Sequence, residues 1–334
     1  MTSAPFESSA QNAEDVVLWR ALGDVGAGRY VDVGANEPVV DSITWAFYAR
    51  GWRGITAEPV PALVAAHRAQ RPEDVQVEAV IGALDSTEVV LHSIAGTGLS
   101  TISDDIAARH AGRGWQVEDH TVPVRRLDDV LAEAGWDDGR DIHLLTVDTE
   151  GAEKAVLESI DLRRFRPWVL VVEATAPNST EQRHGDWEHL VLAADYVFCL
   201  FDGLSRFYVA AEHAEALAPR LSYPACALDS FTTLPARRAS DELAEARSAL
   251  DAVRGQLSQA QARADELLQE VVRWRAAAVS RWSAALGGAA SASANSELGV
   301  LRSEVEAMRN TVSWRVTRPL RAVRTRAGGL REHL

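Results

Sequence analysis

The chain contains little lysine and cysteine, and it has no long apolar run. Lys154 is the single lysine among its 334 residues, so arginine supplies almost all of the positive charge. Two cysteines, Cys199 and Cys226, are too few for a disulfide framework or a four-thiolate zinc site and fit a reducing compartment. No run approaches 18 apolar residues and the first basic residue is Arg20, so neither a transmembrane helix nor a secretory signal is predicted. We therefore expect a cytoplasmic protein.

Charge is divided unevenly along the chain. The formal net charge is −14, yet residues 236–334 hold 16 arginines against 11 acidic residues. The first 235 residues hold 18 basic and 37 acidic residues, and such an acidic body argues against a nucleic-acid-binding surface.

Short apolar runs alternate with longer amphipathic stretches between residues 28 and 173, which predicts a parallel sheet with crossover helices. The predicted strands are Arg29–Val33, Gly54–Glu58, Val75–Val80, Ile142–Val147 and Trp168–Glu173. A helix is expected over Asp41–Arg50, after Pro38. Tyr196–Phe201 and Arg206–Val209, separated by a turn-like D-G-L-S, predict an antiparallel hairpin at the end of the set.

After Ala236 the composition shifts to Ala, Arg, Glu and Gln, and a different architecture is predicted. Apolar residues recur with 3,4 spacing from Leu243 to Trp274, which is the pattern of a coiled-coil seam. We divide the chain into a domain at 1–235, a coiled coil at 236–282, a flexible small-residue linker at 283–297, and a short amphipathic helix with a basic tail at 298–334. A homodimer through residues 243–274 is expected, and an antiparallel hairpin with the 298–312 run is the alternative.

The segment Y-V-D-V-G-A-N-E-P (Tyr30–Pro38) reads as a strand, a tight turn and a helix start. Gly34 would let the backbone approach a ligand, and the acidic Asp32 before it suits a cationic group. The G-x-G-x-x-G pattern of dinucleotide enzymes is absent, which disfavours a nicotinamide-dependent oxidoreductase. Glu58 ends the next predicted strand, where a carboxylate can bind two ribose hydroxyls. An ordinary strand-to-helix turn with no ligand remains the alternative.

Six ordered motifs resemble the FkbM family of S-adenosylmethionine-dependent methyltransferases. They are Q-N-A-E-D-V-V-L-W (Gln11–Trp19), Y-V-D-V-G-A-N (Tyr30–Asn36), G-W-R-G-I-T-A-E-P (Gly51–Pro59), G-T-G-L-S-T (Gly96–Thr101), V-D-T-E-G (Val147–Gly151) and V-V-E-A-T-A-P-N-S (Val171–Ser179). The resemblance spans residues 11–232 and none of the tail.

This resemblance implies an α/β, Rossmann-like methyltransferase fold, with a mostly parallel sheet and a terminal antiparallel hairpin, followed by the α-helical coiled-coil tail. S-adenosylmethionine is the implied cofactor. Carried over, Asp32, Gly34 and Asn36 would hold its amino-acid end and Glu58 its ribose. Pro38 and Ala83 depart from the family pattern, so the adenine contacts are not assigned.

A hydroxyl acceptor requires a base, and the candidates follow the later strands, where open α/β sheets bind ligands. We assign Asp148 to positioning near the methyl group, with His184 or Glu173 as proton acceptor. Alternatively, Glu150 caps the following helix and His184 is a surface loop residue. Asp148, Glu150 and Glu173 could also bind magnesium, but their spacing does not require it and no metal is predicted.

The sequence thus predicts an O-methyltransferase acting on a sugar hydroxyl in surface glycan or glycolipid biosynthesis. The alternative is a non-catalytic scaffold that organises a glycan-synthesis complex through its coiled coil. The Arg-rich C-terminus suggests peripheral contact with the anionic inner face of the membrane.

Overall fold

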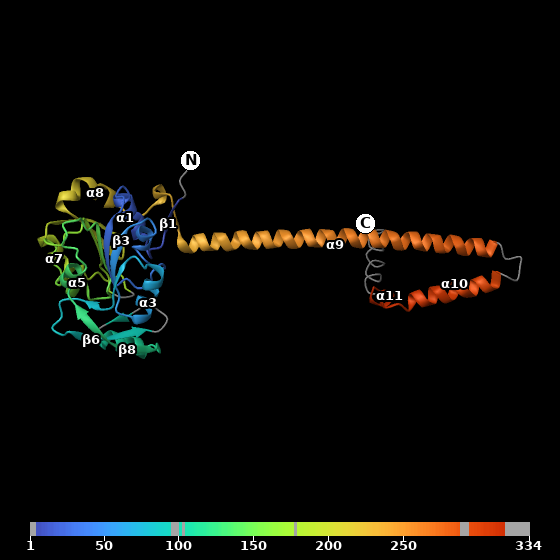
Figure 1. Ribbon diagram of the computed structural model, residues 1–334, viewed down its shortest axis with the longest axis horizontal. Coiled ribbons are helices and arrows are strands. Elements are labelled where there is room, and N and C mark those ends of the chain that lie inside the picture. The colour runs from blue at the N-terminus through green and yellow to red at the C-terminus, as the bar shows by residue number, and fades with distance from the viewer. Residues whose placement is uncertain (1–4, 95–99, 102–103, 177–178, 288–293, 318–334) are drawn as a thin grey trace. The chain divides into compact units, whose positions relative to one another are not determined.

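The computed structural model describes residues 5–94, 100–101, 104–176, 179–287 and 294–317. The chain divides into two units, Met1–Glu242 and Leu243–Leu334 (Figure 1). In the part of the chain that the structure describes, no helix combines the length and apolar content needed to cross a bilayer.

A seven-stranded sheet forms the centre of the first unit. In spatial order its strands are β11 (Tyr196–Phe201), β12 (Ser205–Ala210), β10 (Val169–Glu173), β9 (Leu144–Val147), β2 (Arg29–Val33), β3 (Arg53–Ala57) and β4 (Val75–Val77). β12 is antiparallel to both of its neighbours, and the other pairs are parallel. The predicted α/β fold with a mainly parallel sheet and a terminal antiparallel hairpin is therefore confirmed.

Alternating residues of the central strands enter two different hydrophobic layers. Val31 and Val33 of β2 pack with the helices α5 (Leu127–Glu133), α6 (Glu153–Leu157) and α7 (Glu188–Ala193). Tyr30 faces the other way, toward a layer built by α1 (Glu14–Leu22), α2 (Trp45–Tyr48) and α8 (Ala214–Leu221). This two-residue period places Asp32 on the same side of the sheet as Tyr30.

A second, smaller sheet lies beside the ends of the central strands. Its order is β5 (Val80–Ile81), β8 (Val117–Arg125), β6 (Glu88–Ile94) and β7 (Ser100–Thr101). Val80, Leu91 and Val122 form a core of its own. The remaining elements of the first unit are α3 (Pro61–Gln70), α4 (Asp104–Gly112), η1 (His184–Asp186), η2 (Ala211–His213), η3 (Ala227–Asp229), and a parallel pair of β1 (Phe6–Ser8) and β13 (Phe231–Thr233).

Two local predictions are wrong. The predicted strand Val75–Val80 is two strands, because the chain leaves the large sheet after Val77 and joins the small sheet at Val80. The predicted helix Asp41–Arg50 is only the short α2, since Asp41 has a left-handed φ of 55° and forms a bridge with Ala10.

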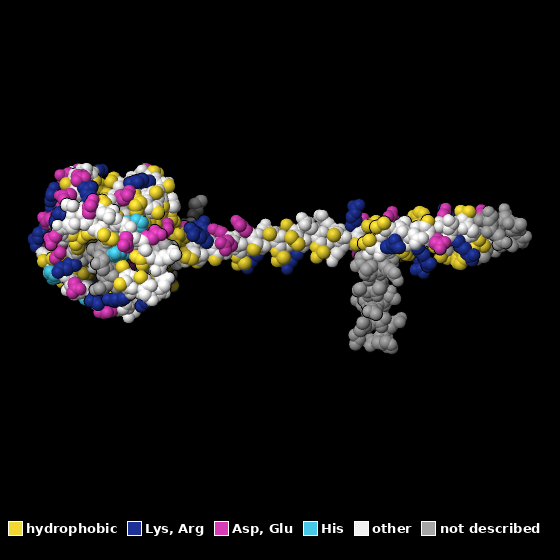
Figure 2. Space-filling view, turned by 90° about the horizontal axis from the view of Figure 1, so that it is seen from below, with side chains coloured by type: hydrophobic (Ala, Val, Ile, Leu, Met, Phe, Trp, Pro, Cys, Tyr) yellow, Lys and Arg dark blue, Asp and Glu magenta, His cyan; other side chains and the backbone are white. Residues whose placement is uncertain are grey.

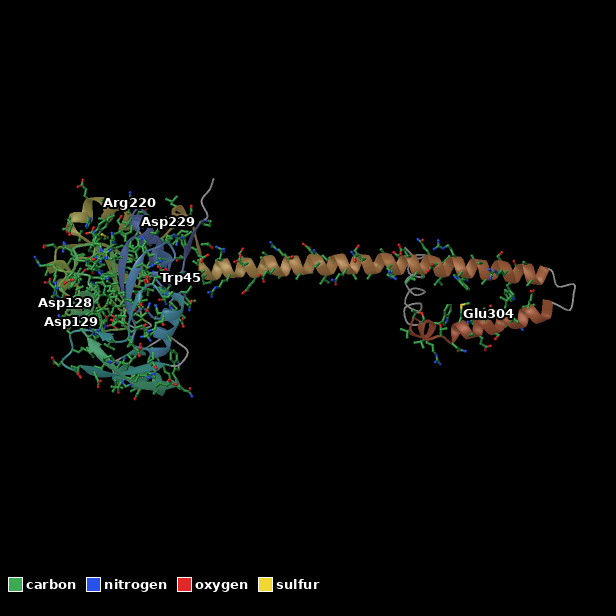
Figure 3. The ribbon with its side chains drawn as sticks, in the orientation of Figure 1. Trp45, Asp128, Asp129, Arg220, Asp229 and Glu304 are labelled. Carbon is green, nitrogen blue, oxygen red and sulfur yellow. The ribbon has the colours of Figure 1, made fainter. Side chains whose placement is uncertain are left out.

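After β13 the chain continues as one long helix, α9 (Leu234–Gly287), whose first residues belong to the first unit. The second unit holds the rest of α9, together with α10 (Ala294–Arg309) and α11 (Val312–Val316). Asp229, labelled in Figure 3, accepts hydrogen bonds of 3.0 and 3.1 Å from Arg20, which ties the segment before α9 to α1. Both helices extend into the predicted linker at 283–297, since α9 ends at Gly287 and α10 begins at Ala294. The centre of the linker, 288–293, and most of the basic tail, 318–334, lie outside the described residues.

Candidate active site

The turn after β2 brings two backbone segments into unusually close contact at Gly34. Gly34 has a φ of +81°, and its N–H donates to Ala57 O at 3.0 Å. A Cβ placed on Gly34 would lie only 1.7 Å from Asp148 O, so no other residue fits here without moving the turn after β9. The predicted ligand-approach glycine therefore lies where the turns after β2, β3 and β9 converge.

Asn36 and Glu58 meet above this turn. Asn36 N donates to Glu58 Oε2 at 3.0 Å, and Val60 N donates to Glu58 Oε1 at 2.9 Å. Burial raises the pKa of Glu58 to about 7. A carboxylate has about four acceptor positions, so two remain for a ligand diol. Asn36 Oδ1 is buried and finds no hydrogen-bond partner among the described residues.

Asp32 points away from that turn, into the interior. Its two oxygens accept hydrogen bonds from Thr44 Oγ1 at 2.5 Å and from Thr146 Oγ1 at 2.7 Å. Thr44 Oγ1 in turn accepts from the fully buried Arg71. Asp32 thus fixes the loop before α2 to β9, and its predicted contact with a ligand stays a prediction.

Three carboxyl groups gather at the ends of β9 and β10. Oxygen atoms of Asp148, Glu150 and Glu173 all lie within 4.8 Å of one another, a spacing at which they could also hold a cation. Glu150 has a left-handed φ of 52°, which turns the chain so that its side chain joins the group. The structure therefore brings together two predicted catalytic residues and the third acid that the sequence analysis considered.

Burial and mutual repulsion raise the pKa values of the three carboxyl groups in this cluster. Desolvation by the surrounding protein, followed by the charge of Asp148, raises the pKa of Glu173 far above its usual range. Desolvation also raises the pKa of Asp148, while a hydrogen bond with Glu173 opposes that increase. Desolvation, followed by the charges of Asp148 and Glu153, raises the pKa of Glu150 to about 7. Because the Asp148 side chain is exposed and Glu173 is half-buried, the raised pKa of Glu173 makes it the member of this pair that holds a proton more readily.

His184, the other predicted proton acceptor, lies in η1. Its Nε2 is 3.9 Å from Glu188 Oε2, and Glu188 also accepts hydrogen bonds from Arg206 and Tyr208. The group of carboxyl ligands within 4.8 Å does not include His184. Its catalytic role stays a prediction without a contact that supports it.

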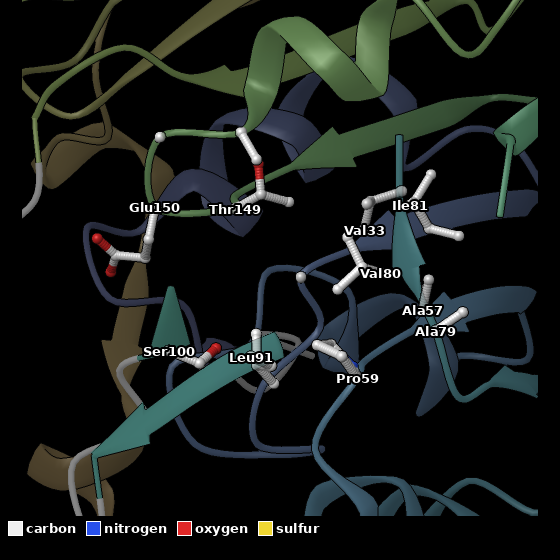
Figure 4. Close-up of a pocket in the computed structure, with 13 residues that line it drawn as sticks. Val33, Ala57, Pro59, Ala79, Val80, Ile81, Leu91, Ser100, Thr149 and Glu150 are labelled. Carbon is white, nitrogen blue, oxygen red and sulfur yellow. The ribbon is translucent and has the colours of Figure 1, made fainter. Parts of the chain in front are cut away.

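A pocket of about 240 Å³ adjoins the turn at Gly34 and extends to the small sheet. Figure 4 shows Val33, Val80 and Ile81 on one side and Leu91 and Ser100 on another, with Glu150 and Thr149 at the edge. Gly34, directly after β2, and Ala57, the last residue of β3, also line the pocket. Most of the lining side chains are apolar. The pocket thus has apolar walls and an acidic edge.

Sequence reasoning missed two parts of this site. Glu153 Oε1 accepts from Thr149 N, Thr149 Oγ1 and Gly151 N at 2.9–3.2 Å, so Glu153 rather than Glu150 stabilises the turn before α6. An acidic residue in the first helical turn could have indicated this role. The small-sheet wall was also missed, although the alternating apolar residues of 88–94 and 117–125 carry a strand signal.

The pocket, at the carboxyl ends of a parallel sheet with one reversed strand, defines the class as an α/β protein built to bind a small ligand at that edge. The family model of the methyltransferase FkbM domain matches residues 32–198, half of the chain. The chain belongs to the FkbM family of S-adenosylmethionine-dependent methyltransferases.

Solved structures with weaker similarity are also methyltransferases. The methyltransferase FkbM of Methylobacillus flagellatus is 14% identical, with a TM-score of 0.33, and the match covers 55% of this chain and 44% of that one. A TehB-like S-adenosylmethionine-dependent methyltransferase of Corynebacterium glutamicum is 12% identical, with a TM-score of 0.33, and 59% and 87% are covered. CalO1, a methyltransferase of calicheamicin biosynthesis solved with S-adenosylhomocysteine, is 16% identical, with a TM-score of 0.29, and 60% and 54% are covered.

The chain spans less than half the length of the first of these structures. No curated protein matches it.

The residues that line the pocket, together with Asn36 and Glu58 beside it in the sequence, fit the donor of this family. Gly34 lines the pocket at the turn after β2, and Asn36 Oδ1 is a buried acceptor with no partner among the described residues, available to an ammonium group. Glu58 retains acceptor positions for a ribose diol. The acidic edge suits a sulfonium cation, and the apolar walls suit a flat base.

Proposed function

We propose that the protein is an S-adenosylmethionine-dependent O-methyltransferase acting on a sugar hydroxyl, in surface glycan or glycolipid biosynthesis. The observation that carries this proposal is the group of three carboxyl groups within 4.8 Å beside the pocket. A hydroxyl must lose a proton as its oxygen is methylated, and an ionised carboxylate next to the pocket can accept that proton.

Gly34, Asn36 and Glu58 are the residues that would hold the donor. When bound, S-adenosylmethionine supplies an electrophilic methyl group on a sulfonium. Gly34 would border the donor where it lines the pocket, and Glu58 would accept hydrogen bonds from the two ribose hydroxyls. Asp32 would support the donor site indirectly. The hydrogen bonds that it accepts from Thr44 and Thr146 hold the segment after β2 in place.

Asp148 is the proposed proton acceptor. The pKa of Glu173 is raised by desolvation and by the charge of Asp148, so Glu173 is the member of the pair expected to hold a proton and Asp148 the member expected to be ionised. The half-buried Glu173 is therefore better suited to orient Asp148 than to accept a proton itself. Holding acceptor and donor in line supplies the larger part of the rate acceleration.

If the acceptor is a glycolipid, the methyl transfer takes place at the inner face of the membrane. The six arginines of the C-terminus from Arg315 to Arg331 support that setting, because each basic residue near an anionic surface contributes about 1 kcal/mol. Binding of the full chain to anionic vesicles, compared with neutral ones, tests this part separately.

Calorimetric titration of the full chain with S-adenosylhomocysteine tests the donor site, and release of that product with nucleotide sugars and lipid-linked sugars tests the reaction. Glu58→Gln should weaken binding. Asp148→Asn should bind normally but turn over about 10²–10⁴ times more slowly. Glu158→Gln, an exposed acid paired with Lys154, is the matched control and should change neither.

A folded chain that binds neither S-adenosylmethionine nor its product would contradict the proposal. Full turnover by Asp148→Asn would assign the proton acceptor to another residue. Loss of a single methyl from surface glycans after gene deletion would support the sugar acceptor, and unchanged glycans would count against it.

A further inference from the structure

The long helix α9 exposes a continuous apolar seam. Its members recur with 3,4 spacing and occupy alternating a and d positions of five heptads. They are Leu243, Ala246, Leu250, Val253, Leu257, Ala260, Ala264, Leu267, Val271 and Trp274. All ten are exposed, and Figure 2 shows apolar side chains spaced along the helix between charged ones. A continuous row of apolar side chains in water, seven of the ten larger than alanine, indicates a surface that is covered by a partner.

We infer that this seam pairs with the same seam of a second copy, as a parallel, in-register, two-stranded coiled coil. The occupant and its direction follow from the charges that flank the seam. In a parallel pair each g residue faces the e residue five positions later on the partner helix. Glu242 then faces Arg247, and Glu270 faces Arg275.

Each of these pairs is attractive and occurs twice by symmetry. The other three g–e pairs of the seam each contain an uncharged residue, so no like charges meet.

An antiparallel pair of the same helices reverses this result. There g residues face g residues and e residues face e residues, so full overlap sets Glu242 against Glu270 and Arg247 against Arg275. The same four residues are thus complementary in the parallel arrangement and repulsive in the antiparallel one. Charge at e and g positions sets partner orientation in this way.

The chain's own α10 is too short to be the occupant of the whole seam. It has 16 residues, about 24 Å of helix, whereas the seam spans about 48 Å. Because α10 follows α9 after a few residues, an antiparallel return can reach only the C-terminal part of α9. Leu243, Leu250 and Leu257 would remain uncovered.

Sedimentation of the full chain over a range of concentrations tests the pairing, and a pair of adjacent valines supplies the matched control. Val271 occupies an a position and is 53% exposed, while Val272 lies off the seam and is 60% exposed. Val271→Asp should raise the dimer dissociation constant at least tenfold, and Val272→Asp should leave it unchanged. A monomeric wild-type chain, or equal effects of both variants, would overturn the inference.

Disulfide trapping tests the direction. In a Cys199→Ser/Cys226→Ser background, Val253→Cys places the new thiols opposite each other only in the parallel, in-register pair, and oxidation should give a covalent dimer. A dimer that does not cross-link there would refute the parallel register.

Charge exchange provides a second test of direction. Combining Glu242→Arg, Glu270→Arg, Arg247→Glu and Arg275→Glu should preserve the dimer. Glu242→Arg with Glu270→Arg alone should weaken it, and preserved association would contradict the inferred pairing.

Discussion

Replacement of Gly34 by alanine has two energetic costs, backbone strain at a positive φ and a steric clash with the turn after β9. Gly34 and Gly51 both have left-handed φ values, +81° and +92°, so alanine at either position costs about 1–2 kcal/mol in backbone strain. A Cβ at Gly51 meets no atom within 4 Å, whereas at Gly34 it would lie 1.7 Å from Asp148 O. Ordinary contact begins near 3.4 Å, so the turn after β9 must move. Such overpacking costs about 1–3 kcal/mol more.

Urea unfolding followed by circular dichroism measures both costs, with Gly51→Ala as the matched control. We expect Gly34→Ala to lose about 2–5 kcal/mol of unfolding free energy, against about 1–2 for Gly51→Ala. Moving the Asp148 turn also displaces the acidic edge of the pocket. Titration with S-adenosylhomocysteine, at a temperature where both variants are folded, should show at least a tenfold weaker affinity, about 1.4 kcal/mol, for Gly34→Ala only. Equal stability and equal affinity of the two variants would refute the argument.

Two further predictions concern the buried charges. Arg71 is fully buried and donates to Pro38 O, Ser42 Oγ and Thr44 Oγ1, so Arg71→Ala should lower the unfolding free energy by about 3–5 kcal/mol. Arg68→Ala, which removes an exposed ion pair with Glu78, should change it by less than about 1 kcal/mol in the same urea titration. The raised pKa of Glu150, about 7, means that the folded state holds a proton that the unfolded state releases above its ordinary value of 4.5, so this group lowers stability as pH rises from 4.5 to 7. The unfolding free energy of Glu150→Gln should therefore rise relative to that of the wild type by up to about 1.4 kcal/mol per pH unit between pH 5 and 7. The difference should stay constant above pH 7. Stability curves that run parallel over this range would contradict the assignment.

The large sheet was predictable because its signals are local. Arg29–Val33 and Tyr196–Phe201 form strands with the expected bounds, since short apolar runs between turn residues are enough to identify buried strands. Which sheet a strand joins could not be predicted in this way. Val75, Val77 and Val80 share one alternating pattern, yet the first two belong to the large sheet and the third to the small one. Periodicity describes a strand but not its neighbour.

The candidate site also has parts that local sequence predicts and parts that it does not. The acids after β9 and β10 were expected together because parallel strands end at one edge. The orientation of Asp32 could not be predicted, because it depends on Thr44, Thr146 and Arg71, which come from distant parts of the sequence. The failed helix at Asp41–Arg50 has the same origin. Side-chain hydrogen bonds from Arg71 to Ser42 and Thr44 hold that loop, and no local propensity reports them.

The two walls of the pocket come from two different sheets, and the small sheet has a hydrophobic cluster of its own at Val80, Leu91 and Val122. Gly34, Ala57 and the 149–152 turn belong to the large sheet, while Val80, Leu91 and Ser100 belong to the small one. Substitutions in the small sheet can reshape one wall while the glycine turn opposite stays intact. The shape of this cavity can therefore be altered through β5–β8 alone, without disturbing the contact between Gly34 and the turn after β9.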